Sequence, residues 1–330
     1  MLIQYQIYNS APVKVTLQNR AFVFPIFSGL FFLLKYAGAA IGEDESEYEK
    51  NLVSDFVNET KHHGDPIHYC RALAMEVDMF SRLGDWEKAI ESQERIKEIY
   101  RVEEHSTKIS EVYASDRVAQ SFGNSAICYI QLGQTQNVHT VCDFVLEELM
   151  PKMDITNVHN SMMCLYRVIW ALKYYDRVSE AKEAFRIYIL QAFEDHYGED
   201  SKTPTMSYFK PIEILFELCD TDQNTRYDEY SNWVLNEENS KFSPFLNNSM
   251  RGLARDADSI LAEICLILLK KGNENRLLLQ KGLDLAAKSM KLAQGEDGSI
   301  TFPFAYTQAK QVFDDLKTFS EEANNGHIQS

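Results

Sequence analysis

The sequence predicts an all-α protein, built as a right-handed α-solenoid of about five antiparallel helix pairs. Apolar residues recur at helical spacing along most of the 330 residues, and hydrophobic residues make up 45% of the chain. Only 14 Gly and 8 Pro are present, which suits long helices with few sharp turns. A helix-turn-helix pattern also recurs, which is typical of repeat architectures.

The first predicted helix covers residues 44–62, where Tyr48, Leu52, Val53 and Phe56 lie at helical spacing among charged residues. The next residues carry a helix boundary signal. Gly64 suits the position after a helix end, Asp65 is a good N-cap, and Pro66 is favourable in a first turn.

The first helix pair follows within residues 67–99. One apolar stripe precedes the turn Gly84-Asp85 and a second helix follows it, so the two helices should be antiparallel; the stripe residues are Leu73, Val77, Phe80 and Leu83 before the turn and Trp86, Ala89, Ile90, Ile96 and Ile99 after it. Ala89 takes the small position where two such helices approach most closely.

Two further units repeat the pattern, with Val138 and Ala181 at the position of Ala89. Tyr129, Leu132 and Gly133 mark the second unit, and the third unit lacks the turn glycine. The spacings of 49 and 43 residues between these positions exceed the roughly 34 residues of a standard tetratricopeptide repeat. Longer helices or insertions in the linkers are therefore expected.

The rest of the chain predicts a degenerate fourth pair, a clearer fifth pair and a final helix. The fourth pair lies in "SYFKPIEILFELCD" and "DEYSNWVL", and the fifth turns at Lys271-Gly272-Asn273. Residues 306–322 form the last helix, which should cap the array. The predicted organisation is an N-terminal segment 1–43 with a hydrophobic helix, helical repeats 44–294, and a capping helix and tail 295–330.

These motifs resemble the tetratricopeptide repeat over roughly residues 67–293. The strings "HGDPIHYCRALAMEVDMFSRLGDWEKAIE", "YASDRVAQSFGNSA" and "LMPKMDITNVHNS" also resemble the C-terminal helical-repeat region of large AAA/NTPase-type multidomain signalling proteins of unicellular algae. That resemblance implies a repeat portion without the nucleotide-binding portion, so it carries over no catalytic residue.

The net charge of the chain limits the classes of molecule that it can be expected to bind. With 49 acidic and 33 basic residues, the formal net charge of −16 opposes binding to a nucleic-acid backbone. The six cysteines are scattered singly, without a CxxC pair, which is typical of buried thiols in a reducing compartment. We therefore expect a cytoplasmic protein whose partner is a protein or peptide, not a nucleic acid.

Residues 21–42, "AFVFPIFSGLFFLLKYAGAAIG", leave two alternatives open, because about 20 apolar residues can cross a bilayer. Pro25 and Gly29 interrupt the run and Lys35 lies inside it, and these features favour a buried helix over a membrane anchor.

The stretch "HHGDPIHYC" at residues 62–70 contains three histidines and a cysteine, all able to bind zinc. The helix boundary separates the first two histidines from the rest, and two residues of separation place His68 and Cys70 about 200° apart on a helix. We predict a helix boundary here and no metal site. No nucleotide-binding loop, HExxH or GxSxG motif occurs, so we expect no enzyme activity and no cofactor.

The first helices of such pairs line a concave groove, which makes their remaining positions candidates for partner binding. Registered on the turns, these are Arg71, Asp78 and Arg82, then Asn124, Ile127 and Gln131, then Met163, Tyr166, Trp170, Lys173 and Tyr174. Tyr166, Trp170 and Tyr174 form an aromatic stripe that either anchors a peptide or packs against the neighbouring repeat. A carboxylate clamp would want Lys and Asn where Ala74 and Asp78 stand, so it is disfavoured.

The sequence thus favours a non-enzymatic scaffold that binds a partner protein or peptide in the concave groove. The alternative is a regulatory or sensor arm of an ATPase-type signal-transduction machine whose catalytic part lies on another chain.

Overall fold

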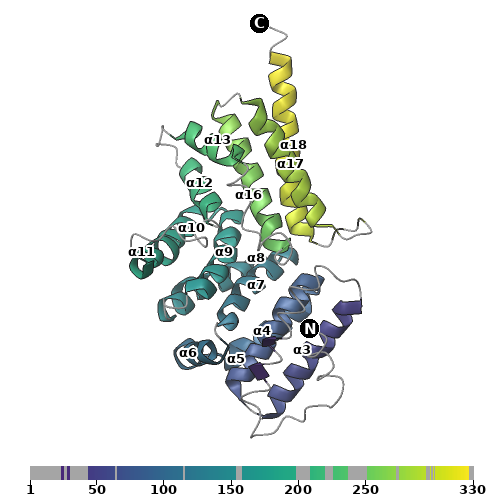
Figure 1. The fold of residues 1–330 in the computed structure, drawn as a ribbon, viewed down its shortest axis with the longest axis vertical. Coiled ribbons are helices and arrows are strands. Elements are labelled where there is room, and N and C mark those ends of the chain that lie inside the picture. The colour runs from purple at the N-terminus through teal and green to yellow at the C-terminus, as the bar shows by residue number, and fades with distance from the viewer. Residues whose placement is uncertain are drawn as a thin grey trace. The chain divides into compact units, whose positions relative to one another are not determined.

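All regular secondary structure in the described part of the chain is helical, which confirms the all-α prediction (Figure 1). The computed structural model describes residues 24–25, 28–29, 44–63, 65–113, 116–153, 158–197, 209–219, 226–236, 251–272, 275–294, 298, 300 and 302–326. The chain divides into two compact units, Met1–Ala192 and Phe193–Ser330. The boundary between these units lies inside the range 44–294, for which the sequence predicts one helical-repeat region.

The first unit contains eight α-helices that begin and end within its described residues: α3 Asp44–His63, α4 Pro66–Leu83, α5 Trp86–Ile99, α6 Val102–Tyr113, α7 Arg117–Gln131, α8 Thr135–Phe144, α9 Val158–Tyr174 and α10 Val178–Phe185. The wider π-helical turns Val145–Leu149 and Arg186–Gln191 continue α8 and α10, and a 3-10 turn at Met150–Lys152 follows the first of these. The short helix α11 covers Ala192–Tyr197.

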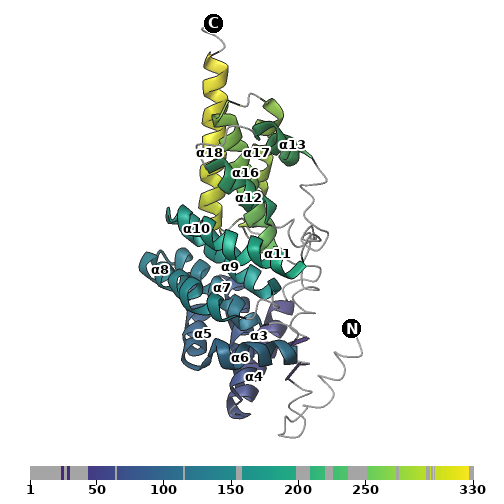
Figure 2. The same cartoon turned by 90° about the vertical axis from the view of Figure 1, so that its left-hand side faces the viewer.

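The three first helices of the predicted pairs are neighbours in space. Helix α4 packs against α3, α5 and α7, while α7 packs against α5, α8 and α9, and α9 packs against α10. Figures 1 and 2 both show α7 between α4 and α9. The three helices therefore follow one another side by side, each accompanied by its own second helix.

The turns within the pairs share a left-handed backbone residue. Gly84 has φ 79° after α4, and Gly133 has φ 67° after α7. The third pair, which lacks a glycine, uses Asp176 with φ 60°. Aspartate tolerates this region better than most residues, because its short polar side chain can bond locally. The registered small positions Ala89, Val138 and Ala181 are all buried, at 1% exposure or less.

Helix α6 is the insertion that lengthens the first repeat, and the sequence pattern did not reveal it as a separate helix. It adds 12 residues between the second helix of the first pair and the first helix of the next pair. This helix accounts for most of the excess in the 49-residue spacing over the roughly 34 residues of a standard repeat.

The second unit contains α12 Lys210–Cys219, α13 Tyr227–Leu235, α16 Arg251–Lys270, α17 Arg276–Leu292 and α18 Pro303–Gly326. The last three helices pack against one another, and α12 and α13 pack on α16. Gly272, with φ 93°, lies in the turn between α16 and α17, where the sequence predicts one. The predicted last helix, residues 306–322, corresponds to most of α18.

Four residues of the range 21–42 are described, and two of these are buried within the first unit. Phe24 is fully buried, 5.7 Å from the ring of Phe56 and 4.7 Å from that of His68 between centroids. Ser28 is 4% exposed. The rest of that range lies outside the described residues. Among the helices of the described residues, none has the length and apolar character needed to cross a bilayer.

The closest approach of α7 to α9 depends on Gly123. A Cβ atom built on Gly123 would lie 2.7 Å from the carbonyl oxygen of Cys164, which is backbone and cannot rotate away. We expect Gly123→Ala to lower the free energy of unfolding by about 1–3 kcal/mol through overpacking. Thermal and urea unfolding would measure this. A Gly→Ala change within an unconstrained helix is stabilising instead, so a higher melting temperature would contradict the close contact.

Candidate functional site

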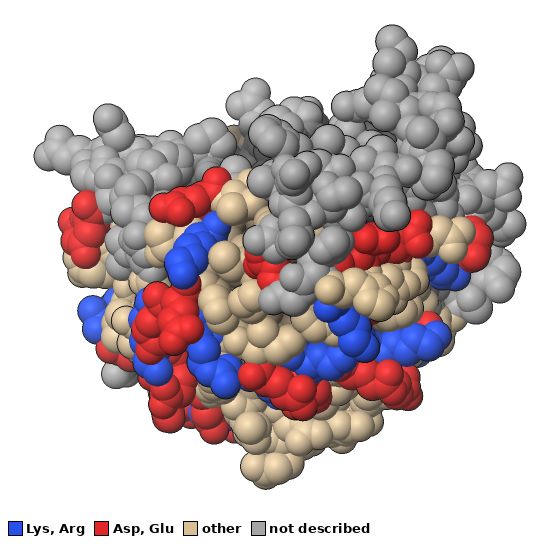
Figure 3. Space-filling model, turned by 90° about the horizontal axis from the view of Figure 1, so that it is seen from below, with Lys and Arg blue, Asp and Glu red and all other residues tan. Residues whose placement is uncertain are grey.

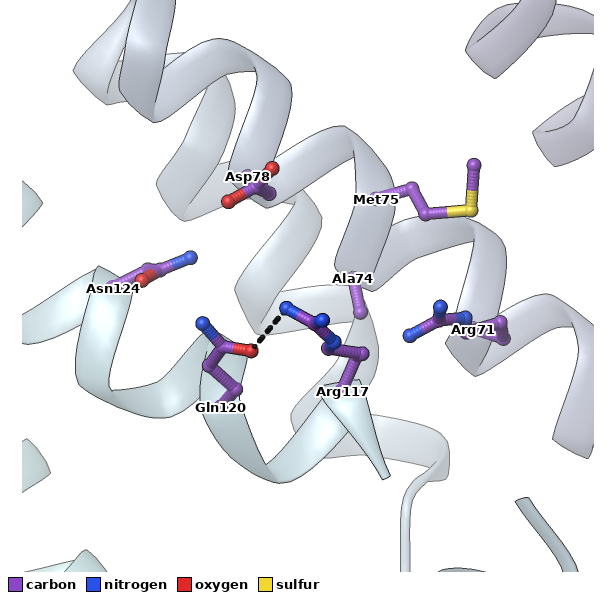
Figure 4. A pocket seen from close by; sticks show the side chains of 7 residues that line it. All are labelled: Arg71, Ala74, Met75, Asp78, Arg117, Gln120 and Asn124. Atoms are coloured by element: carbon purple, nitrogen blue, oxygen red, sulfur yellow. Dashed lines mark hydrogen bonds between the residues drawn. The ribbon is translucent and has the colours of Figure 1, made fainter. Parts of the chain in front are cut away.

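A small pocket lies between α4 and α7, the first helices of two successive pairs (Figure 4). Four of its lining residues come from α4 and three from α7: Arg71, Ala74, Met75, Asp78, Arg117, Gln120 and Asn124. The hollow measures about 10 Å³, which is room for about one water-sized group. It is suited to the end of one side chain.

Arg71 forms the buried cationic wall of this pocket. Its side chain is 1% exposed, and its Nε and Nη2 atoms donate hydrogen bonds to Ser28 Oγ at 3.2 and 2.9 Å. The guanidinium carbon lies 5.2 Å from the centroid of the Tyr113 ring. Burial, together with the charge of Arg117, lowers the pKa of Arg71 to about 9. Contacts on two sides therefore hold a guanidinium in place although burial disfavours its charge.

The histidine-rich stretch at residues 62–70 supports this wall of the pocket. Asp65 caps α4, since its Oδ1 accepts hydrogen bonds from the backbone N–H groups of Ile67 and His68 at 3.0 and 3.4 Å. His68 is buried, with its Nδ1 2.5 Å from the Tyr113 hydroxyl oxygen. No group of three or more potential metal ligands occurs within the described residues.

On the opposite wall, the cap of α7 fixes the first turn that carries Arg117 and Gln120. Asp116 is fully buried, and its Oδ1 accepts hydrogen bonds from the N–H groups of Val118 and Ala119 at 3.0 and 3.2 Å. The hydroxyl of Tyr100 donates to its Oδ2 at 2.6 Å. Burial raises the pKa of Asp116, although these hydrogen bonds oppose that shift.

Helix α7 presents two amides and a guanidinium to the pocket. Arg117 Nη1 donates a hydrogen bond to Gln120 Oε1 at 2.9 Å. Asn124 is 5% exposed, and in the described structure its buried Oδ1 has no hydrogen-bond partner. In Figure 4 the side chains of Arg71, Gln120 and Asn124 point towards the space between the two helices. Because buried polar atoms are nearly always hydrogen-bonded, Asn124 is suited to receive an incoming group.

Asp78, the acidic residue of the pocket, belongs to an ion-pair network. Arg82 Nε lies 3.4 Å from Asp78 Oδ2, and Arg82 Nη2 also pairs with Glu49 on α3. Although burial opposes it, the charges of Asp78 and Glu49 raise the pKa of Arg82. The carboxylate of Asp78 is therefore partly neutralised by its own helix.

Among the sequence-predicted groove residues, the structure brings Arg71, Asp78 and Asn124 into one pocket, with Arg82 beside them. Ile127 and Gln131 are half-buried further along α7, and Lys173 is half-buried on α9. The side chain of Met163 lies outside the described residues. The three residues of the aromatic stripe differ in exposure. Tyr166 and Trp170 are buried, at 5% and 8% exposure, whereas Tyr174 is 41% exposed. Burial of the first two favours the packing alternative for them.

Sequence reasoning missed Arg117 and Gln120. Gln120 lies one helical turn before Asn124, on the same face of α7, so extending the register of Asn124 backwards by four residues would have found it. Arg117 directly follows the N-cap Asp116. It lies at the opposite end of α7 from the turn at Gly133, and the predicted groove positions are spaced from that turn.

The buried thiols do not provide a nucleophile. Burial raises the pKa of Cys128 to about 11 and that of Cys70, Cys142, Cys164 and Cys265 to about 12. These groups are therefore protonated near neutral pH, and the thiolate is the reactive form.

We expect Asp116 to stabilise the start of α7, which carries the pocket residues Arg117 and Gln120. We expect Asp116→Ala to cost about 2–4 kcal/mol of unfolding free energy, because it removes a helix cap and leaves the buried Tyr100 hydroxyl without its acceptor. Chemical denaturation would measure the loss. Asp116→Asn is the matched control, since asparagine also caps helices. An equal loss in both variants would contradict the role of the cap.

The Asp116→Asn variant should also differ from wild type in how its stability depends on pH. The folded-state pKa of Asp116 lies above its unfolded value, so wild type loses stability as the pH rises from the usual aspartate range through the raised pKa. The Asn variant has no such ionisation. Its stability relative to wild type should therefore increase over that pH window in denaturation curves, and a decrease would contradict the raised pKa.

We expect the buried charge of Arg71 to make the folded protein less stable than a hydrophobic residue at the same position would. Since burial lowers its pKa, the folded state holds the charged form at a disadvantage, and Arg71→Met should change the unfolding free energy by less than about 1 kcal/mol or raise it. Thermal unfolding measures this. A loss above about 3 kcal/mol would mean that the contacts to Ser28 and Tyr113 outweigh desolvation.

No family model matches the chain, and no curated protein or solved structure matches it either. The comparisons therefore assign no family, and the geometry of the pocket is the basis for the functional proposal.

Proposed function

We propose that this chain is a non-enzymatic binding protein that holds an extended segment of a partner protein across α4, α7 and α9. In this proposal the helix pairs form a right-handed, tetratricopeptide-like solenoid, and these three helices line its concave face. The observation that carries the proposal is the Asn124 carboxamide, which is buried at the α4–α7 pocket with its Oδ1 lacking a hydrogen-bond partner among the described residues.

Asn124 fits an extended peptide for a chemical reason. A carboxamide offers one acceptor and two donors, so it can pair with both the N–H and the C=O of a peptide backbone. Such a pairing would satisfy the buried oxygen, which otherwise costs about 1–3 kcal/mol. Helical proteins and folded partners have few free backbone groups, whereas an extended segment presents them along its length.

The pocket is also preformed on both sides. Asp65 and Asp116 cap the two helices, and Ser28 fixes Arg71. A partner therefore loses its own conformational freedom on binding but needs little reordering of the site. The small hollow would accept one side-chain end, which gives the groove a means of choosing among partners.

A photo-crosslinking experiment tests the proposal in lysate of the source cells. The full chain carries p-benzoyl-phenylalanine in place of Ile127, half-buried on α7 one turn from Asn124, or in place of Thr140, exposed on the second helix α8. We expect an adduct from the first position and not from the second, and an excess of unlabelled wild type should remove it.

The partner identified by mass spectrometry is then purified. It should bind wild type, and it should bind Asn124→Ala about tenfold more weakly, because one buried hydrogen-bonding group is lost and no added volume blocks the hollow. Circular dichroism must show equal helicity in the two proteins. Adducts of equal yield from both positions, or an unchanged affinity of the variant, would reject the groove as the binding face.

A further inference from the structure

The three first helices differ in charge from the second helices that accompany them. Between them, α4, α7 and α9 contain five basic residues and two acidic ones: Arg71, Arg82, Arg117, Arg167 and Lys173 against Glu76 and Asp78. Glu76 is engaged by the second helix α5, where Arg95 pairs with it and Ser92 Oγ donates to its Oε2 at 2.7 Å. Arg82 is in turn paired with Asp78 and with Glu49 on α3, and the three first helices together keep a net positive charge.

The second helices have the opposite balance. Together, α5, α8 and α10 contain seven acidic residues and four basic ones: Glu87, Glu91, Glu94, Glu98, Asp143, Glu180 and Glu183 against Lys88, Arg95, Lys97 and Lys182. The whole chain has a net charge of −16. The sign of the charge thus changes between the two layers of helices, in a protein whose overall composition would predict an acidic surface throughout.

From this charge distribution we infer that the groove recognises an acidic segment of its partner, with one Glu or Asp carboxylate bound in the α4–α7 pocket by Arg71 and Arg117, while the Asn124 Oδ1 accepts a hydrogen bond from a backbone N–H group of the same segment. This inference rests on the proposed function and names its class of ligand. A carboxylate is small enough for its leading oxygen to enter a hollow of about 10 Å³. Guanidinium groups match carboxylates in geometry as well as in charge.

The remaining charges are compatible with such a ligand. Asp78 is paired with Arg82, so its repulsion of a bound carboxylate is reduced. On the face drawn in Figure 3, Lys and Arg side chains alternate with Asp and Glu, without one broad positive surface. A densely charged nucleic acid would meet these carboxylates, whereas a peptide with spaced acidic residues would place its charges only where the groove is basic.

The test uses fluorescein-labelled peptides with the full-length protein at low salt, read by fluorescence anisotropy. The probe is an alternating Gly-Glu peptide of about a dozen residues, long enough to cross three helices that lie roughly 10 Å apart. Alternating Gly-Gln and Gly-Lys peptides and a uridine oligonucleotide are the comparison ligands. We expect the Gly-Glu peptide to bind at least about tenfold more tightly than each of them.

Two variants locate the binding. Arg117→Gln should weaken the Gly-Glu peptide by about tenfold, since it removes a charge from the pocket. Arg186→Gln makes the same substitution on an exposed residue that follows the second helix α10 and should change the affinity by less than about twofold. Equal melting temperatures would show that neither variant acts through unfolding.

Several outcomes would overturn the inference: undetectable binding of the Gly-Glu peptide, tighter binding of another ligand, or equal losses in the two variants. A groove-dependent adduct at residue 127 together with a failed Gly-Glu peptide would leave the proposed function standing and reject the acidic ligand alone. Failure of the residue-127 adduct would reject the proposed function itself.

Discussion

The placement of α7 is the constraint on which the candidate site depends. At Gly123 its backbone comes so close to the Cys164 carbonyl on α9 that even a methyl group would not fit. About one turn earlier, Gln120 of the same helix lines the pocket that α7 forms with α4, and Asp116 fixes where the helix begins. The packing that sets the distance to α9 and the cap that sets the start of α7 therefore also set one wall of the pocket.

The opposite wall contains a side chain whose charge is disfavoured by its own burial. A buried guanidinium is a costly way to fill the space beside Tyr113, because desolvation disfavours its charge. Ser28 and the Tyr113 ring offset part of that cost and fix the orientation of Arg71. Asn124 adds a second polar group whose oxygen lacks a partner among the described residues. Two such departures at one place are more typical of a binding site than of a core.

Local chemistry made much of the fold predictable from the sequence. The cap at Asp65 and the turns at Gly84 and Gly133 depend on only a few neighbouring residues, and they occur where the pattern indicated. The contact of Arg71 with Ser28, 43 residues away, depends on the packing of segments distant in the chain and has no local signal. The burial of Trp170 could not be predicted for a similar reason, because helical spacing shows which residues share a face of a helix but not what packs against that face.

The first and second helices of the pairs differ in charge, and this difference can matter to a ligand only because electrostatic interactions in salt solution have a short range. At physiological ionic strength charges are screened over about 8 Å, and a helix with its side chains is about 10 Å across. A ligand in the proposed groove would therefore interact mainly with Arg71, Arg117 and their neighbours, while the acidic second helices would lie about one helix diameter further away. Under the proposed function, a protein with a net charge of −16 could therefore still bind a carboxylate at short range.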